Sequence, residues 1–231
     1  MKKYFKVAAL IVFILSSACF TLQAQRFRIE SGYSQPRIFS SERSNRYFHG
    51  FHLGGTVEFE SPQVGFLSLQ TGLTYSYMFG NNSQRFHFNN NNSVSDSIRI
   101  NTQGHQLNIP VYAVASYTLF RGVLRVSAFA GPNFNIGLYM PQRVETTIRD
   151  NNPYGLQGLQ FIENMGYRFG YSDLYDGRLR RFNLQMDVGA AVQWWKLQVR
   201  SGYSFGLNNL NIHDSDRKRQ SGWFVSLAYE F

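Results

Sequence analysis

The last ten residues of the chain, GWFVSLAYEF (222–231), decide the fold. Alternate residues from Trp223 to Phe231 are all apolar, whereas the positions between them include Ser226 and Glu230. Strict alternation of this kind predicts a β-strand with one apolar face. A terminal aromatic ring such as that of Phe231 has nothing to pack against in a soluble domain, because chain ends usually fray. The ending therefore favours a strand whose apolar face meets something other than a protein core.

The same two-residue period recurs along the chain, and no convincing amphipathic helix interrupts it. Seven further segments show the pattern: 27–34, 51–59, 67–79, 105–119, 124–138, 181–195 and 196–205. Connections of two kinds alternate between the strands. Tight turns are expected around Pro62, at Arg121-Gly122 and at Trp195-Lys196. Long polar loops are expected at 35–49, 80–104, 141–180 and 207–220.

An even number of strands with short turns at one end and long loops at the other is typical of bacterial outer-membrane barrels. We therefore predict an all-β fold, an eight-stranded antiparallel up-and-down transmembrane β-barrel with periplasmic termini and extracellular long loops. A soluble β-sandwich or lipocalin-like barrel also needs an apolar face, so that face alone does not exclude either one. Neither of these soluble folds is expected to place its short turns at one end and its long loops at the other.

The aromatic residues separate these alternatives, because membrane interfaces select rings at two levels. On the expected apolar faces, the rings near the periplasmic ends are Phe27, Phe59, Tyr117, Trp194, Tyr229 and Phe231. Those near the outer ends are Tyr33, Phe51, Tyr77, Phe79, Phe182, Phe205 and Trp223. Scattered core aromatics of a soluble sandwich would not form two levels. The pattern favours the membrane barrel.

The N-terminal residues 1–24 predict a secretory signal peptide, with charged MKKYFK, an apolar run and the small-residue end LQA. The barrel domain then covers 25–231. The apolar run is short for a spanning helix, although a retained anchor is the alternative. Lipidation of Cys19 is a second alternative, but Ser16 stands where a lipoprotein box usually has Leu. Cys19 is the only cysteine, so ordinary cleavage leaves no thiol for a disulfide, a nucleophile or a metal site.

The chain has a formal net charge of +9, and removal of Lys2, Lys3 and Lys6 leaves +6. An exported protein rarely meets nucleic acid, so we expect none as a partner. Arginine forks suit phosphates, and the expected outer loops are rich in arginine. We therefore expect outer-membrane lipid and lipopolysaccharide as partners. The many aromatic residues of 141–180 favour a folded cap or strand extensions over a slack tether.

The inward faces of the predicted strands carry charged and amide side chains. The charged positions are Arg28, Glu30, Glu58, Arg125, Asp187, Arg200 and Glu230. An eight-stranded barrel is just wide enough for side chains to fill, and enclosed charges must pair and hydrogen-bond. We predict that these seven residues form a polar network in the lumen. A narrow ion path through this network is the alternative. The sequence does not specify the pairings.

Histidines near the outer rim are the candidates for catalysis: His49, His52, His87, His105 and His213. His52 faces inward on the same strand as Thr56 and Glu58, but these lie four and six residues deeper, too far apart for one site. No histidine spacing indicates a metal site, and no nucleophile elbow is present. We expect no catalytic residue, metal or cofactor.

Several segments resemble the PorT-like outer-membrane β-barrel family of Bacteroidota. They are the L-x-I-P strand at 107–110, the stretch Ala130-Gly131-Pro132, and VRSGYSFGLNNL (199–210) followed by SGWFVSLAYEF (221–231). The resemblance covers 26–231 and implies an eight-stranded outer-membrane barrel. A few members of that family assist type IX secretion, and many have no assigned role. The 141–180 loop is longer than expected for the family, which puts transfer of any partner in doubt.

These observations predict a non-enzymatic outer-membrane protein with a structural or partner-binding role, such as an accessory of type IX secretion or envelope assembly. The alternatives are a narrow ion or solute channel and a rim enzyme acting on lipid A or peptides. A further envelope or secretion protein is an expected partner. Trp223, Tyr229 and Phe231 on the last strand resemble the signal that the barrel-assembly machinery recognises. The barrel-assembly machinery is therefore a second expected partner.

Overall fold

The computed structural model describes residues 24–40, 46–61, 64–87, 95–147, 170–212 and 217–231. The expected signal peptide lies outside these ranges apart from Ala24, and His213 lies outside them as well. Within the described residues, no helix is both long and apolar enough to cross a membrane.

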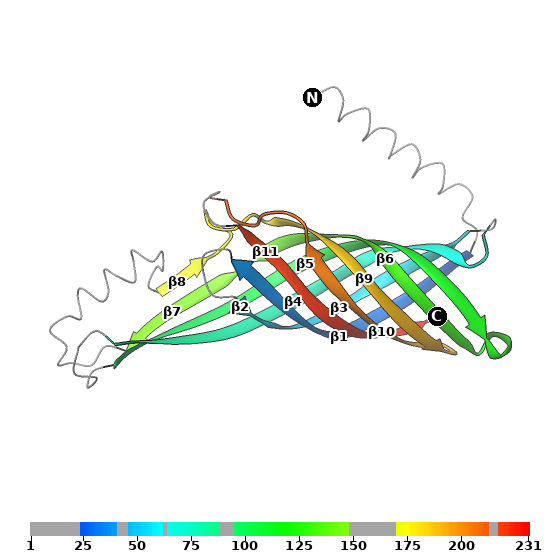
Figure 1. Ribbon diagram of the computed structural model, residues 1–231, viewed down its shortest axis with the longest axis horizontal. Helices are drawn as coiled ribbons and strands as arrows, with labels where there is room; N and C mark the ends of the chain where they lie inside the picture. The colour runs from blue at the N-terminus through cyan, green and yellow to red at the C-terminus, as the bar shows by residue number, and fades with distance from the viewer. Residues whose placement is uncertain (1–23, 41–45, 62–63, 88–94, 148–169, 213–216) are drawn as a thin grey trace, which may run out of the picture.

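Eight long strands form a closed antiparallel ring (Figure 1). They are β1 (Ala24–Ser40), β3 (His49–Glu60), β4 (Leu67–His87), β5 (Ser95–Leu119), β6 (Leu124–Tyr139), β9 (Phe182–Trp194), β10 (Leu197–Gly206) and β11 (Lys218–Glu230). Each pairs with the next long strand along the chain, and β11 returns to β1. The prediction of an eight-stranded up-and-down barrel is confirmed.

The two faces of this wall have opposite polarity. Side chains that point outward are apolar and exposed in the isolated chain, as Trp194 (71%) and Leu227 (54%) show. Side chains that point inward are largely polar, and Arg28 and Asp187 are each only 1% exposed. A polar interior with an apolar exterior is the arrangement that a lipid solvent selects.

Tight connections gather at one end of the barrel, which we call the turn end. The β3–β4 connection spans 61–66, the 3-10 turn η1 (Phe120–Gly122) joins β5 to β6, and Trp195-Lys196 joins β9 to β10. Trp195 takes a left-handed conformation (φ 56°) to reverse the chain there. These connections lie where the sequence predicted them.

At the other end the sheet continues beyond the ring. The β4–β5 ladder runs on from Gly80–Thr102 to His87–Ser95. β7 (Pro141–Thr147) pairs with β5, and β8 (Gly170–Asp173) pairs with β7. We call residues 80–87, 95–104, 141–147 and 170–173 the arm. Figure 1 shows it extending away from the barrel, opposite the end where the C-terminus lies.

The expected loop boundaries are therefore too wide. Within 80–104, only 88–94 lies outside β4 and β5, and β1 extends six residues past the expected strand end at 34. Strand β2 (Arg46–Tyr47) pairs with β1 inside the segment 35–49. Strands β7 and β8 occupy parts of 141–180, and β11 begins within 207–220. The physical reason is that apolar alternation marks only strands in contact with lipid, whereas backbone pairing continues in water with polar side chains.

The first and last strands form the seam of the ring. Their register runs from Arg28 opposite Glu230 to Ser40 opposite Lys218. The last residue extends this seam, because the Phe231 backbone N–H donates to the Phe27 carbonyl at 3.1 Å and the two rings lie 5.7 Å apart. Phe231 is thus a part of the wall rather than a frayed end.

We predict that deletion of Phe231 lowers the amount of folded barrel severalfold, because the final contact of the seam and its ring pair are lost. The measurement is the fraction of the chain that migrates as the compact, unboiled form in gel electrophoresis of isolated membranes. Phe66→Ala is the matched control, since Phe66 is an exposed ring at the same end but outside the seam. Unchanged amounts of compact protein after the deletion would contradict the assignment.

Candidate functional site

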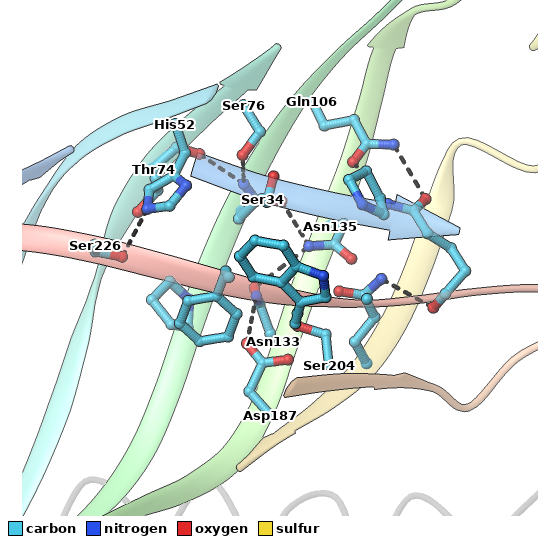
Figure 2. Close-up of a pocket in the computed structure, with 18 of the residues that line it drawn as sticks. Ser34, His52, Thr74, Ser76, Gln106, Asn133, Asn135, Asp187, Ser204 and Ser226 are labelled. Carbon is cyan, nitrogen blue, oxygen red and sulfur yellow. Dashed lines mark hydrogen bonds between the residues drawn. The ribbon is translucent and has the colours of Figure 1, made fainter. Parts of the chain in front are cut away.

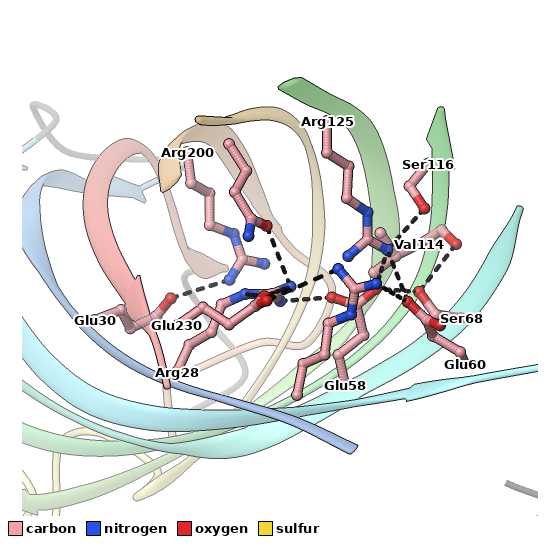
Figure 3. A network of polar contacts seen from close by, with 12 residues as sticks. Arg28, Glu30, Glu58, Glu60, Ser68, Val114, Ser116, Arg125, Arg200 and Glu230 are labelled. Atoms are coloured by element: carbon pink, nitrogen blue, oxygen red, sulfur yellow. Dashed lines mark hydrogen bonds and ion pairs between the residues drawn. The ribbon is translucent and has the colours of Figure 1, made fainter. Parts of the chain in front are cut away.

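Four charged residues cross the interior near the turn end, and we call them the charged layer: Arg28, Glu58, Arg125 and Glu230. Arg28 donates to Glu58 at 2.5 Å and to Glu230 at 2.7 Å. Arg125 donates to the other oxygen of Glu58 at 2.5 Å. The four side chains come from β1, β3, β6 and β11, so the layer ties together strands that are distant in sequence (Figure 3).

Smaller groups complete the coordination of the charged layer. The Ser68 hydroxyl donates to Glu58, Arg125 also donates to Ser116 at 2.7 Å, and Gln193 accepts from Arg28 at 3.4 Å. Nearer the turn end, Arg26 and Glu60 form a half-exposed pair at 2.7 Å. Buried ions need such additional hydrogen bonds, since Coulomb attraction alone does not offset their desolvation. The sequence pattern does not single out Arg26 and Glu60, because positions at strand ends carry little periodicity.

A second ion pair lies deeper in the barrel. Arg200 donates to Glu30 at 3.1 Å, and its guanidinium lies 4.2 Å from the Phe129 ring centroid and 5.0 Å from that of Tyr112. Asp187 is not in an ion pair among the described residues; it accepts hydrogen bonds from Tyr112 and, at 2.8 Å, from Asn133. The seven residues expected as one network therefore form the charged layer, the Arg200–Glu30 pair and a separately hydrogen-bonded Asp187.

Side-chain amides extend the polar interior toward the arm. Asn135 donates to Asn108 at 2.6 Å, and Asn183 donates to Asn135 at 3.1 Å. Gln106 and Gln220 contact each other through two hydrogen bonds of 3.4 Å across the barrel. These amides come from β5, β6, β9 and β11. Long amide–amide bonds of this kind are weak, so this level can open more readily than the charged layer.

An apolar cap covers the mouth on the arm side. Its buried members are Ile38, Phe48, Met78, Met140, Leu174, Tyr175, Leu179 and Leu210. Tyr175 lies against the wall at Gly137, where a Cβ would approach its ring to 2.1 Å, and Gln106 donates to its hydroxyl at 3.2 Å. Burial raises the pKa of the Tyr175 hydroxyl. The described part of 141–180 thus holds both a cap and strand extensions.

A cavity of about 100 Å³ lies within the barrel between the charged layer and the cap. Figure 2 shows that His52, Ser76, Asn133, Asp187 and Ser204 surround it. Glu30, Arg200 and Tyr112 border it toward the charged layer, and Gln106 and Gln220 border it toward the cap. The cavity therefore combines acidic, basic and amide groups in one space.

The histidines do not form a common site. His49 and His105 point outward, where each shares a hydrogen bond of 2.5 Å with a tyrosine, Tyr33 and Tyr75 respectively. His52 instead faces the cavity and is hydrogen-bonded to Ser226 at 2.8 Å. The side chain of His87 lies outside the described parts, as does all of His213.

The outward histidines belong to an aromatic belt on the arm side of the wall. Successive ring centroids lie 5.1–6.3 Å apart through Trp223, Tyr33, His49, Phe79, Tyr77, His105 and Tyr139. Trp223 also donates to Gln35 at 2.8 Å. At the turn end, Tyr229 and Phe231 stack edge to face at 5.3 Å. Sequence reasoning missed the histidines of the belt, although each occupies an outward position beside predicted belt residues.

A closed ring with lipid-facing apolar residues and a charged interior defines a membrane-spanning β-barrel. A profile of the outer membrane protein beta-barrel domain family matches residues 23–211. Because the match covers most of the chain, the protein belongs to that family, and its place is the outer membrane.

Three solved structures are similar to this chain at low sequence identity. Neisserial surface protein A is 8% identical, covers 90% of this chain and 100% of its own, and gives a TM-score of 0.45. Ail of Yersinia pestis is 12% identical with the same coverage and a TM-score of 0.35. The N-terminal barrel of Pseudomonas aeruginosa OprF is 10% identical, again with that coverage, at 0.32. A search of curated protein sequences finds no match.

We predict that Glu58→Gln lowers the free energy of unfolding by about 3–5 kcal/mol, because Arg28 and Arg125 lose the carboxylate that they share in a buried site. Denaturant unfolding of the barrel in lipid vesicles measures this change. Glu60→Gln is the matched control, since Glu60 is half-exposed and its loss should cost at most about 1 kcal/mol. Equal effects of the two substitutions would show that the charged layer does not stabilise the barrel.

Proposed function

We propose that the protein is a non-enzymatic outer-membrane barrel with a closed lumen, which presents the arm outside the cell to a partner protein. The observation that carries this proposal is the unequal length of the strands. β10 has 10 residues, which matches the ~9–11 needed to span a bilayer. β4 and β5 have 21 and 25 residues. The arm holds residues 80–87 of β4 and 95–104 of β5, so at ~3.3 Å per residue it reaches roughly 25–35 Å beyond the ring along the strands.

The arm offers a surface suited to protein recognition. It is a small sheet in which, among the described strands, β8 pairs with β7 on one side only. An accessible sheet edge can accept an added strand from a partner. Tyr171 on β8 is 66% exposed, and its hydroxyl accepts a hydrogen bond from Tyr139 at 2.6 Å. These features support binding of another envelope or secretion protein. The resemblance to PorT-like proteins favours an accessory role in type IX secretion.

The orientation is part of the same proposal. The turn end and both termini face the periplasm, and the arm faces outward after removal of residues 1–24 as a signal peptide. Arginines near the arm end, such as Arg143 and Arg181, would contact lipopolysaccharide phosphates. Trp223, Tyr229 and Phe231 on β11 would be read by the barrel-assembly machinery. The narrow channel is the weaker alternative, because the charged layer fills the interior near the turn end. An enzyme at the rim is the weakest alternative, because His49 and His105 point outward from the barrel wall whereas His52 points into the cavity.

We predict that Tyr171→Cys reacts with a membrane-impermeant maleimide on intact cells, whereas Phe66→Cys reacts only after the outer membrane is permeabilised. Both residues are exposed, but they lie at opposite ends of the barrel. The only natural cysteine is Cys19, in the expected signal peptide, so the background is low. Labelling of Phe66→Cys on intact cells with protection of Tyr171→Cys would reverse the proposed orientation.

The role of the arm is tested by shortening it. Ser83 of β4 and Arg99 of β5 are directly paired, so residues 84–98 can be replaced by an Asn-Gly turn. This replacement preserves the register of the remaining β4–β5 ladder. We predict that this variant forms the compact barrel at normal levels but loses the proteins that crosslink to the intact chain in native outer membranes. The crosslinker is carried on Tyr171→Cys in both versions. An unchanged set of crosslinked proteins would remove the arm from the proposed function.

A further inference from the structure

The cavity inside the barrel contains two buried charged side chains that each have one unused hydrogen-bonding atom. Asp187 Oδ1 and Arg200 Nη2 have no partner within the described part of the chain. Both residues border the cavity, and they are 1% and 3% exposed. Unsatisfied buried groups are costly, and charged ones most of all, so a site of this kind requires a ligand or ordered water.

The other atoms of these two groups are held in place. Asp187 Oδ2 accepts from Tyr112 and Asn133, the Ser204 hydroxyl lies beside the same carboxylate, and Oδ1 has no partner among the described residues. Arg200 Nη1 donates to Glu30, and the guanidinium is fixed over the Phe129 ring, which leaves Nη2 as the free donor. The positions of both free atoms are therefore set by contacts to the wall before any ligand enters.

Tyr112 brings the free acceptor and the free donor into the same space. Its hydroxyl donates to Asp187, and its ring carries the Arg200 guanidinium at 5.0 Å. A free anionic acceptor and a free cationic donor complement a molecule with one ammonium and one carboxylate. Amide and hydroxyl groups around them, such as Gln185, Ser76 and Ser204, offer further hydrogen bonds. A volume of about 100 Å³ limits the occupant to a very small molecule.

We propose that this cavity binds a small zwitterion of the amino-acid type, with its ammonium on Asp187 Oδ1 and its carboxylate on Arg200 Nη2. This site goes beyond the partner-binding role of the arm and does not depend on it. Binding leaves the net charge of the barrel interior unchanged, because the ligand carries one positive and one negative charge and each meets a group of opposite sign.

Entry is from the arm side. A second, smaller cavity lies under the cap, and it shares Gln106, Asn135 and Gln220 with the first. Tyr175 lines this smaller cavity as well. Among the described residues, the weak Gln106–Gln220 contact lies between the two cavities, and the Tyr175 ring lies with the rest of the apolar cap over the mouth. The charged layer closes the opposite side, so the site is a pocket rather than a passage.

Calorimetric titration of the folded full chain in detergent micelles tests the proposal with three probes. Glycine carries both charges, glycinamide lacks the carboxylate, and N-acetylglycine lacks the ammonium. We expect saturable binding of glycine with one site per chain, and binding weaker by about tenfold or more for each analogue, since each loses a charge-assisted hydrogen bond. Absence of saturable glycine binding, or equal affinity for all three probes, would overturn the proposal and leave ordered water as the occupant.

Two substitutions locate the site on the chain. Asp187→Asn keeps the shape and the contacts to Tyr112 and Asn133, and Arg200→Lys keeps a charge for Glu30. Each should weaken glycine binding by about tenfold or more. Glu60→Gln is the control, because Glu60 lies at the turn end outside the cavity lining, and it should leave binding unchanged. Undiminished binding in both cavity variants would place the ligand elsewhere. The probe series on the unmodified chain decides the matter if a variant fails to fold.

Discussion

The backbone of a chain in lipid has no water to bond with, and this constraint shapes the whole molecule. Every N–H and C=O at membrane depth must find a partner within the protein, so the sheet has to close. Closure with eight strands leaves an interior that side chains fill. The seam between β1 and β11 completes the ring, and the bond from Phe231 to Phe27 continues it to the last residue. Phe231 thus belongs to the seam that closes the ring.

Closure places charges in a confined interior, and their pairing determines what the interior can do. Arg28 and Arg125 share the Glu58 carboxylate, and these side chains together fill the barrel near the turn end. The cap around Tyr175 covers the opposite mouth. Between them, Asp187 and Arg200 are held by neighbours that leave one atom of each free. Beyond the membrane the constraint disappears, because water can bond with an open sheet edge. The arm can therefore have the edge strand that the barrel cannot.

The sequence was informative wherever lipid imposes a pattern. Alternation located the eight strands and the inward positions of residues such as Arg28 and Asp187. It did not specify partners, because period two places a side chain on a face but not beside a particular residue on a distant strand. That Asp187 bonds Tyr112 while Arg200 bonds Glu30 depends on side-chain reach across the lumen. The strands of the arm within 80–104 lie in water, where nothing selects apolar alternation, so the sequence predicts a loop there. The aromatic residues of 141–180, in contrast, did indicate a cap or strand extensions. The cap residue Tyr175 gave no signal beyond being aromatic within a long loop.

The wall is closed, and the charged layer fills its interior near the turn end. Planar-bilayer recording with the purified chain tests this most directly, because any continuous aqueous path carries ions. The structure predicts a silent membrane, with no stable conducting steps across the usual range of voltages. Uniform, reproducible conductance steps from the unmodified protein would contradict the claim.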